Sequence, residues 1–231
     1  MTNHFHMNLN RMALLVALVL CGVILFWAPF MKIATSNIIL NGVIIGTALF
    51  GIGLCFVQMF RLVPEYNWAR AFFHGRRNVA LPPRLLRPLA MILRGGGRVP
   101  VHVMRDVTEM VLVRFDDSRE SIRYITNTLV FLGLLGTFWG LIMTVGGFAD
   151  LIGGLNFDDE TVLSVMQAGM TRPLAGMATA FTSSMLGLGG SLIVGFLGLQ
   201  VELAQNAIYR EVEDYLAART IVSEHAAQKQ E

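Results

Sequence analysis

Four long stretches of the sequence contain no Asp, Glu, Lys or Arg. They are residues 12–31, 33–60, 124–149 and 173–201, which together make up 103 of the 231 residues. The 34 charged residues are therefore confined to the other 128 positions, where their density matches the value of about 25% typical of soluble domains. A helix needs roughly 20 apolar residues to cross the hydrocarbon core of a bilayer. The pattern predicts an all-α membrane protein with four transmembrane helices, and it excludes an ordinary soluble enzyme and a secreted disulfide scaffold.

The first two spans, about 12–31 and 38–60, are separated by only a few polar residues. We therefore expect residues 1–60 to form an N-terminal tail and a tight hairpin of two transmembrane helices. The first stretch is longer than the apolar region of a signal peptide and no A-x-A-like cleavage site follows it, so we interpret it as a span. Cys21 and Cys55 lie inside these spans at different depths, and we expect no disulfide between them.

The distribution of arginine and lysine predicts the orientation of the chain. Residues 61–123 contain twelve Arg, no Lys and six acidic residues, whereas residues 150–172 contain four acidic residues and only Arg172. By the positive-inside rule the long basic segment is cytoplasmic and the short acidic loop is outside, although Lys32 would also lie outside. Both termini are then cytoplasmic, and residues 202–231 form a cytoplasmic helix and tail. We interpret the basic segment as a contact for lipid headgroups rather than for nucleic acid.

The second span is expected to lead into an irregular region, and the last two spans are expected to continue as long helices. Residues 61–98 contain the breakers Pro64, Pro82, Pro83, Pro88 and the glycines at 95–97. From Val101 apolar residues recur at helical spacing, which predicts one helix that enters the membrane near Tyr124 and spans it over about 124–149. The fourth span, about 173–201, is expected to continue as a helix to about Ala218, and residues 223–231 are expected to fray.

Small and hydroxyl-bearing residues form a stripe along one face of each of the last two spans. On the third span the stripe consists of Gly133, Thr137, Gly140, Thr144 and Gly147, and on the fourth of Gly176, Thr179, Ser183, Gly187 and Gly190. Such stripes allow close packing of helix backbones, with hydroxyls bonded to the preceding turn. The other interpretation is a hydrated path, in which the hydroxyls hold water or pass ions.

The spans contain no ionisable side chain that could carry a proton. Proton-translocating proteins normally keep such a group at membrane depth, so a proton channel built from this chain needs a titrating group from a partner helix. The sequence also lacks phosphate-binding, nucleophile and metal-ligand motifs, apart from His4 and His6 in the N-terminal tail. We expect no enzymatic activity, no cofactor and no metal site.

Two motifs in the last two spans resemble those of a known family. The segment FLGLLGTFWGL at 131–141, which includes Gly133, Gly136 and Gly140, resembles the third-helix motif of the MotA/TolQ/ExbB proton-channel family. The segment PLAGMATAFTSSMLG at 173–187 resembles the family's last helix. The resemblance covers roughly residues 116–218, and the four spans correspond to the number in MotA.

The resemblance implies a homopentamer around a dimer of a single-span partner of the MotB/ExbD/TolR kind, whose transmembrane aspartate carries the proton. Threonines on the family's last two helices line the proton path, and they correspond here to Thr137 and Thr179. We add Ser183 and Thr144 as further candidate hydroxyls on the same stripes. The implied function is a proton-channel or stator subunit of an ion-driven motor in the bacterial inner membrane, in which proton flow powers rotation or force on the envelope.

The chain departs from the family pattern in its last helix, where the glutamate of ExbB-like members corresponds to Leu174. A mechanism that uses this glutamate does not transfer. The sequence leaves open whether protons or sodium ions flow, and whether the energised process is import, envelope integrity, gliding or secretion, defence or flagellar rotation. The alternative function is a non-conducting membrane scaffold that organises an envelope complex, with stripes that serve packing alone.

Overall fold

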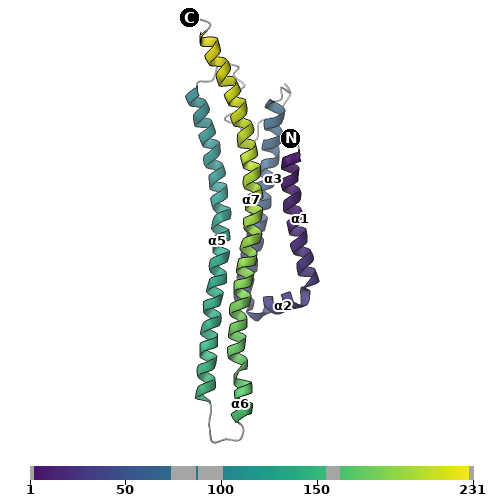
Figure 1. Ribbon diagram of the computed structural model, residues 1–231, viewed down its shortest axis with the longest axis vertical. Coiled ribbons are helices and arrows are strands. Elements are labelled where there is room, and N and C mark those ends of the chain that lie inside the picture. Colours follow the sequence, from purple (N-terminus) through teal and green to yellow (C-terminus); the bar gives the residue numbers. More distant parts are fainter. Residues whose placement is uncertain (1–2, 74–86, 88–100, 155–161, 229–231) are drawn as a thin grey trace. The chain divides into compact units, whose positions relative to one another are not determined.

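The computed structural model describes residues 3–73, 87, 101–154 and 162–228. The elements in those ranges are all α-helices (Figure 1). They are α1 (Asn3–Leu25), α2 (Trp27–Ser36), α3 (Ile38–Phe73), α5 (Val101–Gly153), α6 (Val162–Gly169) and α7 (Thr171–Gln228). The prediction of an all-α chain is confirmed.

Four of the helices are long and apolar enough to cross a membrane. The candidate spans are Met7–Leu25, Ile38–Phe72, Thr108–Gly153 and Met166–Tyr215. Many of their large apolar side chains are exposed, including those of Leu14, Phe131 and Phe181. Exposed apolar surface on this scale is unfavourable in water and is expected in a multi-pass membrane protein.

The predicted first span, 12–31, is broken, and the predicted tight hairpin is wrong. Helix α1 ends at Leu25, and the separate ten-residue helix α2 lies between it and α3. The backbone at Phe26, with φ −103° and ψ 35°, leaves the helical region. A physical reason lies three residues further on, because Pro29 has no N–H to donate to the carbonyl of Leu25. The uncharged stretch 12–31 is long enough to cross a bilayer, but it does not form a single helix.

The predicted interruption at Pro64 is also wrong, since Pro64 lies inside α3. The helix continues past it with Leu62, Tyr66 and Ala69 buried along one face, and this packing offsets the lost backbone bond. The other predicted breakers, Pro82, Pro83, Pro88 and glycines 95–97, lie outside the described residues.

The long helices predicted after Val101 and in the fourth span are present. Helix α5 is unbroken from Val101 to Gly153. Helix α7 runs from Thr171 to Gln228, past the predicted end at Ala218 and into the segment predicted to fray.

The chain packs as two compact units. The charged unit comprises Met1–Met12, Leu54–Ile122 and Leu197–Glu231, and the span unit comprises Ala13–Gly53 and Arg123–Phe196. The divisions at 122/123 and 196/197 lie close to the ends of the uncharged stretches that begin at 124 and end at 201. The division by packing therefore follows the division by charge.

The charged unit is held together by a polar cluster around Arg119. Its Nε donates to Gln205 Oε1 at 2.9 Å, and its terminal nitrogen donates to Asn206 Oδ1 at 2.6 Å. Gln58 Nε2 donates to the carbonyl of Ser118 at 3.2 Å. These bonds connect α5 to α7 and α3 to α5 within the unit, and the guanidinium fork provides the geometry for two acceptors at once.

Candidate functional site

Helices α5 and α7 pack antiparallel in the span unit through their glycine faces (Figure 1). A Cβ added to Gly133 would lie 3.2 Å from Gly187 Cα, and one added to Gly140 would lie 2.5 Å from the nitrogen of Ala180. A Cβ on Gly147 would lie 2.8 Å from the nitrogen of Pro173. At Gly140 and Gly147 the obstructing backbone atoms cannot rotate away, so these two positions require glycine, whereas at Gly133 the neighbouring backbone would have to move by a few tenths of an ångström.

The other candidate packing glycines, Gly136 beside the stripe of α5 and the stripe glycines of α7, extend the same contact. A Cβ on Gly176 would lie 2.6 Å from the nitrogen of Thr144, and one on Gly136 would collide with the side chain of Ser183. Gly190 faces Ala48 of α3, whose Cβ lies 3.3 Å from the position of an added Cβ. The stripes of α5 and α7 thus pack against each other, and α3 lies against the pair.

The candidate ion-path hydroxyls differ in their exposure. Thr179, Thr144 and Ser183 are buried, with 3%, 7% and 0% of their surface exposed, whereas Thr137 is half-buried at the edge of the contact. Among these four residues, Thr137 therefore has the most accessible side chain.

Three of the four candidate hydroxyls bond to carbonyls of their own helix. Thr137 donates to Leu134 O at 2.6 Å and Thr179 donates to Ala175 O at 3.0 Å. Thr144 is placed 2.8 Å from Gly140 O and 3.3 Å from Pro173 O, which belongs to α7. Each hydroxyl oxygen keeps lone pairs that can accept a bond from water or from a protonated carboxyl group.

Ser183 belongs to a polar network that the sequence analysis missed. Its Oγ donates to Asn41 Oδ1 at 2.8 Å, and Asn41 Nδ2 donates to Ile33 O at 2.8 Å and to Ser36 Oγ at 3.1 Å. The oxygens of Ser36 and Thr182 are 3.1 Å apart and share one hydrogen bond. The network connects the end of α2, the start of α3 and α7, and it uses both amide hydrogens of Asn41.

The sequence contained a signal for this network. Asn41 is a carboxamide within an uncharged stretch, and it is fully buried in the structure. A search for ionisable groups passes over it, although an amide at membrane depth also needs partners. A search that includes amides would have returned Asn41 together with the other four amides of the uncharged stretches, Asn37, Gln58, Asn127 and Gln200.

Charged groups lie at the end of the α5–α7 hairpin. Arg172 pairs with Asp150, and both side chains are exposed. Cys21 and Cys55 form no disulfide. Within the described ranges, His, Cys, Asp and Glu form no cluster of three that could hold a metal. The polar side chains found at the α5–α7 contact in the span unit are thus hydroxyls, bonded to backbone carbonyls and to the amide of Asn41.

Comparison of the chain with family models, with curated proteins and with solved structures found no match.

Replacing Gly140 with alanine tests the close contact of α5 and α7. The added methyl group meets the backbone of Gly176 and Ala180, and overpacking of this kind costs about 1–3 kcal/mol. We expect the variant to have a lower midpoint of thermal unfolding than the native chain in detergent. The midpoint is measured by size-exclusion chromatography of samples heated to increasing temperatures. Gly146→Ala, on the same helix with open space around it, is the control and should leave the midpoint unchanged or higher. Equal midpoints for the two variants would contradict the close contact.

A double-mutant cycle on Asn41 and Ser183 tests the polar network. Asn41→Leu removes both donors and leaves the Ser183 hydroxyl without its acceptor, at a cost of about 0.6–2 kcal/mol. Ser183→Ala in the Asn41→Leu background should cost less than it does in the native chain. Strictly additive effects on unfolding free energy would show that the two side chains do not interact.

Proposed function

We propose that the chain is a proton-channel or stator subunit of an ion-driven motor in the bacterial inner membrane. It would act as a homopentamer around a dimer of a single-span MotB/ExbD/TolR-like partner. Both termini and the extended ends of α5 and α7 would lie in the cytoplasm. A helix of 53 residues, the length of α5, is about 80 Å long, far more than the hydrocarbon core of about 30 Å, which supports such an extension.

The observation that carries the proposal is the accessible hydroxyl of Thr137 within the uncharged part of the α5–α7 hairpin. The uncharged stretches 124–149 and 173–201 include the glycine contacts between α5 and α7 in the span unit, so these stretches offer no carboxylate, amine or guanidinium group that could bind and release a proton at that depth. Thr137 lies at the edge of the contact with lone pairs available. The proposed path therefore needs an acid from the partner and offers it a polar surface.

The proposed mechanism follows from the cost of charge in hydrocarbon. The partner's aspartate takes up a proton from the outside, passes Thr137 and Thr179 in its neutral form and releases the proton inward. Neutralisation matters because a charged side chain at the bilayer centre costs about 2.5–3.5 kcal/mol on insertion scales and more in simulations. Since Thr179 is buried, we assign the first contact with the partner to Thr137, with Thr179 behind it.

A second candidate function is a non-conducting scaffold for an envelope complex. The observation that favours it is that the hydroxyls of Thr144, Thr179 and Ser183 are buried and already bonded within the chain. In that function the two stripes serve packing alone, and no ion passes Thr137.

Valine substitutions separate the two functions. Thr137→Val and Thr179→Val remove a hydroxyl and nearly keep the shape of the side chain, so we expect each to abolish proton-coupled function while assembly remains intact. The measurement is proton flux into liposomes that contain the chain and its partner, alongside native mass spectrometry of the complex. Thr128→Val is the control, because this half-buried threonine on α5 also bonds to its own helix, at Tyr124 O. Normal flux in both variants would rule out the proposed path.

Co-purification tests the proposed partner directly. We expect the detergent-solubilised chain to retain a single-span protein with an aspartate in its span, in a ratio of two partners to five chains. Replacement of that aspartate with asparagine should abolish flux and leave the complex intact. A homogeneous assembly without any single-span protein, isolated from its native membrane, would favour the scaffold.

A further inference from the structure

Helix α2 runs across the direction of α1 and α3 rather than continuing either of them (Figure 1). It begins after the break at Phe26 and ends at Ser36, and the backbone of the next residue, Asn37, is extended. Breaks of this kind leave backbone groups without helical partners, and lipid offers none. The position of α2 is therefore constrained to places where other groups or water satisfy its ends.

Side chains satisfy the junction between α2 and α3. Asn37 Oδ1 accepts from Leu40 N at 3.3 Å, which is an N-cap of α3. The carbonyl of Ile33 accepts from Asn41 Nδ2 and from Ser36 Oγ, each at 2.8 Å. Because Ser36 also bonds to Thr182, the end of α2 is held against α7 at a fixed place.

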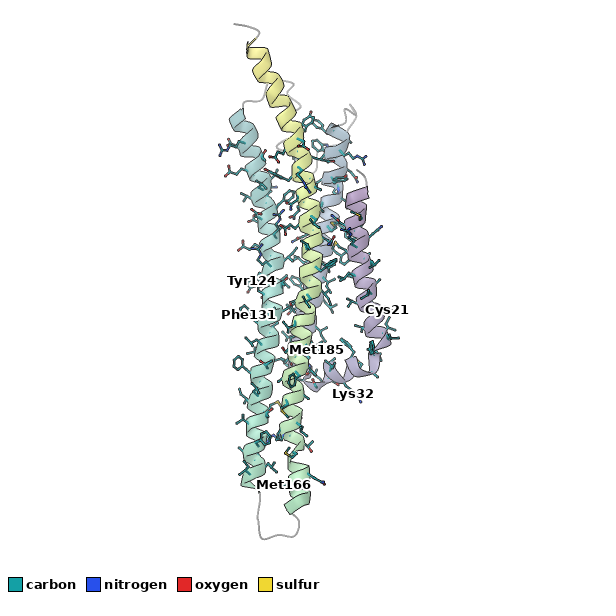
Figure 2. All side chains as sticks on the ribbon, in the orientation of Figure 1. Cys21, Lys32, Tyr124, Phe131, Met166 and Met185 are labelled. Atoms are coloured by element: carbon teal, nitrogen blue, oxygen red, sulfur yellow. The ribbon has the colours of Figure 1, made fainter. Side chains whose placement is uncertain are left out.

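The two faces of α2 differ in exposure. Residues Phe30, Ile33 and Ala34 face inward and are partly covered. The outward face carries Trp27, Ala28, Met31, Lys32 and Thr35, all of them exposed. An indole, a thioether and an ammonium group on one face suit the boundary between acyl chains and headgroups, where tryptophan and lysine are enriched. Figure 2 shows Lys32 on this helix.

Contacts within the span unit give the depth of α2. Ser36 bonds to Thr182, which lies between Ala180 and Ser183, the residues that contact Gly140 and Gly136. These glycines are about 12–16 residues, or roughly 18–24 Å, along α5 from Tyr124. Tyr124 is the first residue of the uncharged stretch of α5 and is exposed (Figure 2).

We measure the hydrocarbon core from Tyr124, because charged residues precede it. The core is about 30 Å thick, so α2 lies about 6–12 Å inside its opposite edge. Interfacial helices lie about 5–10 Å into this boundary. The Lys32 side chain can extend toward the headgroups from that depth. Asp150 lies about 10 residues after Gly140 on α5. Its exposed ion pair with Arg172 of α7 is therefore close to the headgroup layer.

We propose that α2 is an interfacial helix whose outward face binds the lipids of the leaflet near the Asp150–Arg172 pair. Trp27 and Met31 contact the outer part of the acyl chains, and Lys32 contacts lipid phosphate. The partner of this surface is the lipid at the membrane boundary, whereas the helices on either side of α2 cross the bilayer. This inference does not depend on the proposed motor function.

Quenching of tryptophan fluorescence by brominated lipids tests the proposal. The Trp68→Phe and Trp139→Phe variant retains Trp27 as its single indole, and it is reconstituted into vesicles of phosphatidylcholine brominated at shallow or deep acyl positions. We expect at least twofold stronger quenching of Trp27 by the shallow bromine. A Leu18→Trp variant that lacks the three native indoles is the control. Leu18 is exposed about 10 Å along α1 from Leu25, and the deep bromine should quench it more strongly.

Two results would overturn the proposal. Equal or stronger quenching of Trp27 by the deep bromine would place α2 within the core, and no quenching by either lipid would mean that protein covers it. If the double substitution prevents folding, the difference in quenching between the native chain and Trp27→Phe gives the same comparison. Lys32→Leu should shift quenching toward the deep bromine, whereas Lys32→Arg should not. An unchanged ratio in Lys32→Leu would refute the phosphate contact.

Discussion

Helices in hydrocarbon cannot rely on the hydrophobic effect to hold them together, because lipid tails are as apolar as their side chains. The span unit depends instead on direct contact between the backbones of α5 and α7. At Gly140 an added methyl group would lie 2.5 Å from a backbone nitrogen of α7, and at Gly187 it would lie 2.6 Å from Gly133 Cα. The absence of side chains at these positions allows dispersion contacts along the whole pair.

Hydrogen bonds add direction to this contact. Asn41 is fully buried and bonds to Ser183, Ser36 and the carbonyl of Ile33. Because unpartnered polar groups are costly in hydrocarbon, these partners fix where α3 begins and where α2 ends relative to α7. The same bonds occupy hydroxyls that a sequence stripe suggests for an ion path, and Thr137 remains the more accessible candidate.

The sequence predicted the fold wherever composition or periodicity determines it. Uncharged stretches predicted four apolar helices, and the lack of breakers after Val101 predicted the unbroken α5. The break at Phe26 was missed because an apolar count does not register geometry, and the break at Pro64 was wrongly predicted because packing offset a lost hydrogen bond. Stripe spacing could not predict which hydroxyl stays accessible, since Thr137 and Thr144 share a stripe but differ in burial. The burial of each threonine depends on which residues of the neighbouring helix lie against it, and this is not encoded in the spacing along one helix.

The contacts between α5 and α7 recur every seven residues, with Gly133, Gly140 and Gly147 opposite Gly187, Ala180 and Pro173. If one helix moved along the other, each of these glycines would leave the residue it contacts, and side-chain atoms would collide with the backbone of the neighbouring helix. The hairpin therefore resists shear along its axis. Within the span unit, a displacement of α7 along its axis is therefore passed to α5 through these contacts.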